Sequence, residues 1–511
     1  MNLAPLDIGV LIVYFLAMLA IGAWFSRTND STEQYFLGGR AFSGWVIGLS
    51  LVGTSISSIT FLAYPGDAFK TNWLRFLPNL ALPVAILIAA WWFLPRLRKP
   101  GSVTAYEFLE ERYGPAIRGY GAVAFLIAQL ARISMILYLV SLVIQTITGL
   151  DAHLSVVIAG LFVVAYTILG GIEAVVWTDV IQTLVLLTGG IFCLITIVSL
   201  VPGGLPEILS TAWAAQKLGV GEFTATGYRP ADWSLALSHK TATMMLCIGL
   251  INWLTEYSSN QNTVQRFCAS RSIAEARKAM WICALVSIPT WAFFMFLGSA
   301  LYVLFLHVPA ELPASILRGQ AKAEAILPYF ITTYLPSGLV GLVIAAAIAA
   351  AMSSLDSSIN AIATVSTHDI YRRFLSRNLT DRAYLRFARI VTASAGFVMI
   401  LGALYLIDAS TTTLQDTATV VTALLAGGLL TIYLIGFFSR RCQTIHIVIG
   451  ILATMCYTGW TIASSNGMAS YPFDLYYTGL IGNIVMFMAA WGSSYIIKPA
   501  KPTTEYQTSI T

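Results

Sequence analysis

Charged residues are scarce in this chain of 511 amino acids: they make up 10% of it, whereas 57% of the residues are hydrophobic. The mean hydropathy is +0.77. A soluble globular domain carries about 25% charged residues, so this sequence lacks the polar side chains that would cover a water-facing surface. The composition excludes a soluble globular protein and indicates one surrounded by lipid.

Cysteine and histidine are also scarce, with six and five residues respectively. The cysteines are scattered, which indicates neither a metal-ligand spacing nor a disulfide framework. The histidines lie at the ends of apolar segments or between them, without an Asp or Glu grouping. A basic segment before the first apolar run is missing, which argues against a cleaved signal peptide. With no nucleophile-and-base pair or metal cluster in the sequence, we expect the protein not to be an enzyme.

Apolar runs long enough to cross about 30 Å of hydrocarbon recur along the whole length. They predict an all-α polytopic membrane protein with about thirteen transmembrane helices. The expected spans are 6–26, 42–68, 73–95, 116–148, 152–170, 175–200, 241–262, 279–306, 326–358, 385–407, 411–438, 443–465 and 471–497.

Lysine and arginine predict the orientation of these spans. If the spans alternate in direction, 21 of the 29 basic residues, Arg266 among them, lie on one side of the membrane and seven on the other, while Arg132 lies within a span. The positive-inside rule then places the N-terminus outside and the C-terminus in the cytoplasm, and we expect a multi-pass protein of the plasma (inner) membrane. Anionic lipid is the usual partner of such basic loops, so we expect no nucleic-acid partner. We also expect the protein to be a monomer.

Polar side chains at membrane depth are costly and mark binding sites or pathways. Such residues gather in "SLVGTSISSITF" (50–61), in "AAAIAAAMSSLDSSINAIAT" (345–364), at Gln129 and Arg132, and in "INWLTEYSSNQNTVQRF" (251–267) with Glu256. A dehydrated alkali cation prefers hard oxygen ligands such as hydroxyls and carbonyls. A helix that is unwound at mid-membrane frees its carbonyls for this purpose, so the first two segments together predict a sodium site.

Two of these features have an alternative interpretation. Small and hydroxyl residues in membrane helices also form close-packing surfaces. Arg132 could form a structural ion pair with Glu256 or Asp356. Alternatively, its guanidinium could recognise an anionic substrate, because the fork fits a carboxylate bidentately.

The motifs "SSITF" (57–61), "GGIEAVVWTDVIQ" (170–182), "NQNTVQRF" (260–267) and "AAAMSSLDSSINAIATVSTHDIYRR" (349–373) resemble the sodium/solute symporter family. Within that family the chain is most similar to the bacterial sodium-coupled sialic acid symporters. The resemblance implies a LeuT-type fold of two inverted five-helix repeats. It divides the chain into an extra N-terminal helix and loop (1–41), repeat one (42–200), an external loop (201–240), repeat two (241–438), two C-terminal helices (439–497) and a disordered cytoplasmic tail (498–511).

The resemblance also implies where the helices break and which residues bind. The first helix of repeat one would break near 53–54, and that of repeat two within 251–262, where Asn252 and Thr255 lie. The main sodium site would comprise Gly53, Ile56, Ala350, Ser353 and Ser354. A second sodium site would comprise Asp179, Ser353, Asp356 and Ser357; Asp356 replaces a serine of the sialic acid branch, so it would either strengthen cation binding or admit a proton instead. The candidate substrate-binding residues are Thr54, Ser55, Ser57, Thr60, Asn79, Gln129, Arg132 and Glu256.

The activity implied is import of a sialic acid, coupled to one or two Na⁺ ions, by alternating access. A sodium symporter for a neutral monosaccharide or inositol, or for another small carboxylate, is the alternative. Arg132 separates the acidic from the neutral substrates, because a neutral monosaccharide or inositol would not need it, whereas a small carboxylate could use it.

Overall fold

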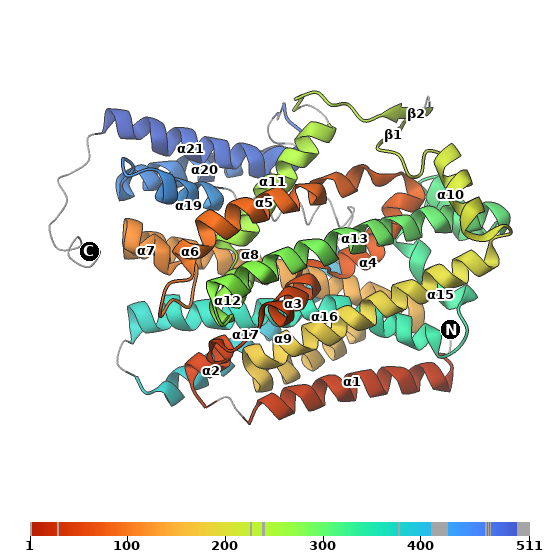
Figure 1. The fold of residues 1–511 in the computed structure, drawn as a ribbon, viewed down its shortest axis with the longest axis horizontal. Helices are drawn as coiled ribbons and strands as arrows, with labels where there is room; N and C mark the ends of the chain where they lie inside the picture. The colour runs from red at the N-terminus through yellow and green to blue at the C-terminus, as the bar shows by residue number, and fades with distance from the viewer. Residues whose placement is uncertain are drawn as a thin grey trace.

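The computed structural model describes residues 3–27, 30–224, 227–237, 241–376, 379–409, 428–465, 468, 470 and 472–497. Long helices run along the longest axis of the molecule, with α1 beginning at one end and α21 ending at the other (Figure 1). The expected tail, 498–511, and much of the expected span 411–438 lie outside the described residues.

The helices and 3-10 or π segments, in chain order, are α1 (Pro5–Phe25), α2 (Thr32–Leu37), η1 (Gly38–Arg40), α3 (Gly44–Ser55), α4 (Ser58–Lys70), η2 (Trp73–Ala81), α5 (Leu82–Ile88), η3 (Ala89–Phe93), α6 (Leu94–Leu97), α7 (Glu107–Tyr113), α8 (Pro115–Thr148), α9 (Ala152–Leu200), α10 (Gly204–Ala214), α11 (Ala242–Ser259), α12 (Gln261–Ala269), α13 (Ile273–His307), α14 (Glu311–Leu317), η4 (Ala323–Ala325), α15 (Ile326–Tyr334), α16 (Leu339–Val365), η5 (Ser366–Leu375), α17 (Asp381–Ala409), α19 (Leu429–Phe438), α20 (Thr444–Ser465), η6 (Leu475–Tyr477) and α21 (Thr478–Ile496). The strands β1 (Gly221–Thr224) and β2 (Gly227–Pro230) pair antiparallel, with Gly221 opposite Pro230. This hairpin, in the segment between α10 and α11, is a departure from the expected all-α chain.

The membrane-spanning character of the chain is confirmed, but the count of thirteen helices is not. Nine described helices are long and apolar enough to cross a membrane, or ten if the bent pair α3 and α4 is one span. The expected spans 152–170 and 175–200 are joined in α9, which is kinked at Gly171 (φ 56°, ψ −158°). The expected span 326–358 is two helices, α15 and α16, because the chain turns between them at Gly338 (φ 91°). Glycine takes both conformations without steric cost.

The first broken helix consists of α3 and α4, which meet at an angle of 54°. The break was expected near Gly53 and Thr54, but both residues are still helical in α3. It falls at Ile56, which has an extended backbone (φ −97°, ψ 95°). A glycine is required at position 53 for a different reason. A Cβ there would lie 2.9 Å from the Thr183 hydroxyl and 3.1 Å from the Asp179 carbonyl. Glycine thus lets α3 approach α9 closely.

The second broken helix consists of α11 and α12. The break lies at Asn260 (φ −82°, ψ 114°), within the expected segment, whereas Asn252 and Thr255 are regular helical residues of α11. Asn260 replaces the lost helical bond by accepting the Asn262 backbone N–H on its side-chain oxygen, 3.0 Å away, which is how an N-cap residue begins a new helix.

Helix α16 lies in the interior of the bundle and packs against α1, α8, α9 and α17. All of its residues from Val343 to Val365 are buried. Its alanines allow neighbouring backbones to approach closely. Its N-terminus is capped from α1, because the Asp7 carboxylate accepts the backbone N–H groups of Gly338 (2.6 Å) and Gly341 (2.7 Å). This cap connects the beginning of α16 to α1.

Candidate functional site

The end of α3 contacts the middle of α16, which brings together three of the five residues expected to bind the main sodium ion. The Ser353 hydroxyl donates to the Gly53 carbonyl (2.8 Å) and lies 3.2 Å from the Ala350 carbonyl. The neighbouring Ser354 hydroxyl lies 3.5 Å from the Thr54 carbonyl. Ile56, at the break, follows directly on α3. Hydroxyls from one helix and carbonyls from another are the hard oxygen donors that an alkali cation prefers.

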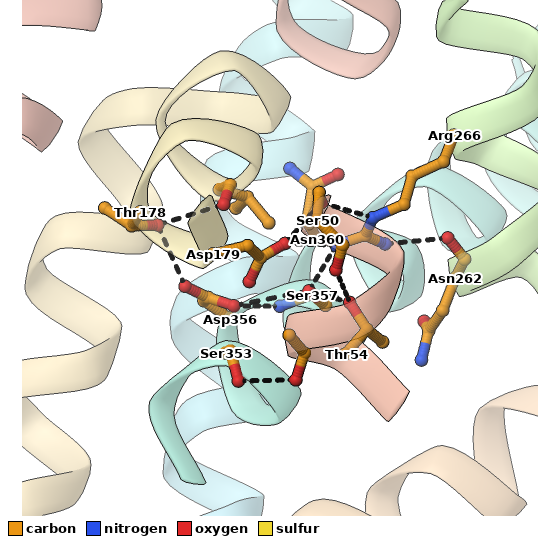
Figure 2. Close-up of polar contacts among 12 residues, drawn as sticks. Ser50, Thr54, Thr178, Asp179, Asn262, Arg266, Ser353, Asp356, Ser357 and Asn360 are labelled. Carbon is orange, nitrogen blue, oxygen red and sulfur yellow. Dashed lines mark hydrogen bonds and ion pairs between the residues drawn. The ribbon is translucent and has the colours of Figure 1, made fainter. Parts of the chain in front are cut away.

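A second polar cluster lies beside this contact, and its centre is Arg266 (Figure 2). The Arg266 guanidinium donates to the Asp179 carboxylate (2.7 Å), to the Ser357 hydroxyl (2.6 Å) and to the Ser50 hydroxyl (2.7 Å). It also donates to the Asn262 carbonyl one turn earlier in α12 (2.7 Å). The sequence places Arg266 beyond the end of an expected span; in the structure it lies in the short helix α12, and its side chain is only 1% exposed.

Arg266 was missed as a site residue because it follows the expected span by only a few positions. The motif "NQNTVQRF" contained the signal that could have identified it. Asn262 donates to the Ser358 hydroxyl (3.2 Å) and Gln265 to the Asn360 side-chain carbonyl (2.7 Å), both on α16. The polar residues of α12 therefore face the bundle interior.

Asp356 is the second carboxylate of the cluster. It accepts hydrogen bonds from the Tyr166 hydroxyl (2.8 Å), the Thr178 hydroxyl (3.4 Å) and the Ser357 backbone N–H (2.6 Å). Tyr166 and Thr178 lie on the two arms of α9 on either side of its kink. Asp356 thus ties α16 to the bent helix α9.

The cluster holds two acidic side chains and one guanidinium. Asp179 and Asp356 are 0% exposed, and Arg266 forms its ion pair with Asp179. One oxygen of Asp179, Oδ1, is buried and has no hydrogen-bond partner within the described residues. With both carboxyls ionised, the cluster would carry a net charge of −1, and an uncompensated charge in the interior costs several kcal/mol. Either a monovalent cation at Asp179 Oδ1 or a proton on Asp356 would offset that cost.

The chemistry of any bound cation is limited by the available ligands. Across the described ranges, no group of three or more His, Cys, Asp and Glu residues could hold a metal ion. The two clusters instead offer hydroxyls, carbonyls and at most two carboxylates. This donor set fits sodium, whereas thiolates and imidazoles would favour a transition metal.

Arg132, the residue expected to meet an acidic substrate, is half-buried in the span formed by α8. Neither carboxylate proposed as its structural partner contacts it. Asp356 is engaged as described above, and Glu256 accepts from the Asn260 amide and the Thr263 hydroxyl, each at 2.6 Å. Within the described part of the chain, Arg132 forms no ion pair.

The other expected substrate residues separate into two groups. Gln129 donates to the Asn260 side chain (3.3 Å), which connects α8 to the second break. Asn79 donates to the Tyr64 hydroxyl (2.8 Å) and so connects η2 to α4. Three others lie on or beside the first broken helix: Thr60 is buried, Ser57 is at the break, and the Ser55 hydroxyl lies 3.9 Å from the Cys283 sulfur.

Thr54 differs from these residues. Its hydroxyl donates to the Ser50 carbonyl (3.0 Å) and lies 3.3 Å from the Ser357 hydroxyl. It thus faces the Arg266 cluster and shares Ser357 with it.

Comparison with known proteins is consistent with this geometry. Residues 35–453 match the model of the Sodium:solute symporter family. The sodium/sialic acid symporter NanT of Aliivibrio fischeri is 30% identical over 490 residues, 96% of this chain and 92% of NanT. The sodium/sialic acid symporter SiaT of Proteus mirabilis is 30% identical over 497 residues, 97% of this chain and 96% of SiaT.

Solved structures agree with the fold. A substrate-bound outward-open state of a Na⁺-coupled sialic acid symporter matches with a TM-score of 0.87 at 29% identity, over 98% of this chain and 99% of that one. MhsT in complex with L-phenylalanine matches with a TM-score of 0.52 at 13% identity, over 88% of this chain and 98% of that one. At that identity MhsT supports the fold alone.

Two discontinuous helices, with hydroxyls and carbonyls meeting between the first of them and α16, define a polytopic membrane transporter of the LeuT type. The chain belongs to the Sodium:solute symporter family, in which sodium is the coupling ion. The expectation drawn from its motifs is confirmed.

The charge balance of the cluster predicts the behaviour of Arg266 variants. Arg266→Gln leaves two buried carboxylates without their cation, and we expect it to destabilise the protein by about 3–5 kcal/mol. The double variant Arg266→Gln with Asp179→Asn removes one charge of each sign and should recover most of that loss. Thermal unfolding in detergent measures both. If the double variant is no more stable than Arg266→Gln, the ion pair is not the reason that Arg266 is required.

Proposed function

We propose that the protein is a sodium-coupled secondary active symporter that imports a sialic acid, N-acetylneuraminic acid or a related sugar acid, and that it catalyses no chemical reaction. The observation that carries this proposal is Arg132, a guanidinium inside a span with no ion pair among the described residues. A sialic acid offers the carboxylate that such a fork binds bidentately. Relatives named as sodium/sialic acid symporters, 30% identical over almost the full length, support the same substrate.

The proposed site residues act in two groups. Gly53, Ile56, Ala350, Ser353 and Ser354 hold the main sodium ion, and Asp179, Asp356 and Ser357 hold a second. Substrate binds between the broken helices, α8 and η2, with Arg132 on its carboxylate. The remaining contacts are assigned to Thr54, Ser55, Ser57, Thr60, Asn79, Gln129 and Glu256. Repeat one (42–200) and repeat two (241–438) then move relative to each other to alternate access.

The proposed orientation follows the basic residues: N-terminus outside and C-terminus in the cytoplasm of a cell whose plasma (inner) membrane holds the protein. The beginning of α1 and the end of α21 lie at opposite ends of the molecule (Figure 1), as an odd number of crossings requires. The end with α7 is then cytoplasmic, and the end with α10 and the β-hairpin is external.

Sodium binding prepares the substrate site. An ion that binds both the α3 carbonyls and the Ser353 hydroxyl fixes the broken helix against α16. The hydroxyls that follow on α3 and α4 are thereby ordered toward the substrate. Coupling of this kind is reciprocal, so bound substrate raises sodium affinity by the same factor.

A neutral monosaccharide is disfavoured as substrate. Placing a guanidinium at the middle of a span costs at least about 2.5 kcal/mol on insertion scales. A neutral sugar offers no charge to offset this cost, whereas a carboxylate does.

Uptake into proteoliposomes tests the function. We expect labelled N-acetylneuraminic acid to accumulate only with an inward sodium gradient. Two sodium ions with one anion carry a net positive charge inward, and a potential of 100 mV, negative inside, contributes about 2.3 kcal/mol per charge. Uptake should therefore rise with that potential.

In Asp356→Asn the cluster is neutral without a cation, so uptake should lose its response to potential. Equal responses to potential in the variant and the original protein would exclude Asp356 from the second site.

Ser353 and Ser354 are predicted to control sodium dependence. Ser353→Ala and Ser354→Ala each remove a hydroxyl ligand, and we expect each to raise the sodium concentration for half-maximal uptake about tenfold, the effect of one hydrogen bond to a charged group. Thr364→Ala is the matched control, since that hydroxyl, also buried in α16, bonds to the Asn360 carbonyl (2.8 Å). Unchanged sodium dependence in both serine variants would contradict the main site.

Arg132 is predicted to control substrate affinity without controlling sodium affinity. Arg132→Gln should lose binding of N-acetylneuraminic acid by at least about tenfold, while sodium still stabilises the protein against heat. The control is Arg229→Gln, an exposed arginine beyond the bundle. If Arg132→Gln takes up the sugar acid normally, a different class of substrate has to be sought among neutral sugars.

A further inference from the structure

A cavity of about 390 Å³ opens at the end of the molecule where α7 lies, far along the bundle from the β-hairpin (Figure 1). It is formed by the segment before α7, the beginning of α8 and the segment η5. Three arginines line it, namely Arg118, Arg372 and Arg373, together with Glu107 and Val103. None of these residues belongs to the sodium or substrate sites described above.

Two of the arginines are fixed by carboxylates. Arg118 donates to Asp369 (2.7 Å) and to Glu110 (2.8 Å). Arg373 donates to the same Glu110 (2.7 Å), so these residues join α7, α8 and η5 into one ion-pair network. The ion pairs hold these guanidiniums in fixed positions at the cavity wall. Little side-chain conformational entropy is therefore lost when an anion binds.

Arg372 differs from the other two. It is exposed, its guanidinium lies over the Tyr384 ring at 5.4 Å, and it forms no ion pair within the described residues. The stacking on Tyr384 orients the guanidinium without using its donors. Arg372 therefore brings a cation with available N–H groups to the rim of the cavity.

The one acidic side chain lining the cavity opposes this positive charge only weakly. Burial raises the pKa of Glu107 to about 7, so near neutral pH much of this carboxyl is uncharged. Its carboxyl oxygens lie 3.3 and 3.4 Å from the Val103 backbone nitrogen, which keeps the side chain against the wall. With Asp369 and Glu110 paired to Arg118 and Arg373, the positive charge left over at the cavity is that of Arg372.

Apolar side chains are exposed directly beside the cavity. Phe374 and Leu375, which follow Arg372 and Arg373 in η5, are 49% and 71% exposed. The Phe374 ring lies alongside α8: a Cβ placed on Gly119 of that helix would be 3.6 Å from the ring. A charged cavity with an adjoining apolar surface suits a ligand that has an anionic head and hydrocarbon chains.

We propose that this cavity binds a phosphate group, with Arg372 as the available donor and Arg118 and Arg373 as fixed positive charges. Three guanidiniums around one site match the planar, bidentate recognition that arginine gives to phosphate. Both an anionic membrane lipid and free phosphate carry this chemistry. The exposed Phe374 and Leu375 favour the lipid, whose chains would cover them at the proposed cytoplasmic surface.

Thermal unfolding of the full chain in a neutral detergent tests the site. The probes are dioctanoyl-phosphatidylglycerol, dioctanoylglycerol, which lacks the phosphate, and inorganic phosphate, all at one ionic strength. We expect the phosphatidylglycerol to raise the unfolding temperature and dioctanoylglycerol to leave it unchanged. Arg372→Gln should weaken the apparent affinity about tenfold, as for one lost hydrogen bond to a charged group. Glu107→Gln should strengthen it, because it removes the only carboxylate of the lining.

Arg382→Gln is the matched control, since Arg382 is an exposed arginine at the start of α17 and does not line the cavity. Equal stabilisation by inorganic phosphate, lost in Arg372→Gln, would support the phosphate site and identify free phosphate as its source. Two results would overturn the proposal: no stabilisation by either phosphate-bearing probe, or the same affinity in Arg372→Gln and Arg382→Gln.

Discussion

The guanidinium of Arg266 connects more of this structure than any other group described above. It lies on the helix that follows the second break, and it binds Ser50 before the first break, Asp179 in α9 and Ser357 in α16. Both discontinuous helices are therefore attached to the same polar centre. In a bilayer every such group must find its partner inside the protein, so this network fixes how the two halves of the bundle meet.

The proposed main sodium site adjoins that centre, and this proximity offers a route for coupling. Ser353 contacts the Gly53 carbonyl, and four positions further along α16 Ser357 contacts both Arg266 and Thr54. A cation that draws α3 toward α16 acts on the same pair of helices that Arg266 joins to α12. Sodium at the proposed site would therefore act on the second broken helix without touching it, which is the physical content of a coupling free energy between sites.

The sequence was sufficient for the class of fold and for the contact between α3 and α16, because apolar length and hydroxyl clusters are local properties. It was insufficient for the position of the first helix break and for the burial of Arg266, because both depend on contacts between helices distant in the sequence. The break at Ile56 was placed at Gly53, since glycine weakens helices; in the structure that glycine serves close approach to α9. Arg266 was counted only toward the orientation, because the positive-inside rule counts arginines outside spans and cannot recognise one that turns inward to Asp179.

Asp356 shows how one substitution changes what the interior must contain. With a serine at position 356, Asp179 and Arg266 alone would neutralise each other. Asp356 adds a second acidic side chain at 0% exposure, and the hydrogen bonds that it accepts from Tyr166, Thr178 and Ser357 bring no compensating charge. An ionised Asp356 would leave the cluster with a net charge of −1, which in the low dielectric of the bundle would attract a cation. A protonated Asp356 would leave the cluster neutral. The carboxyl at position 356 therefore decides between a second coupling ion and a proton.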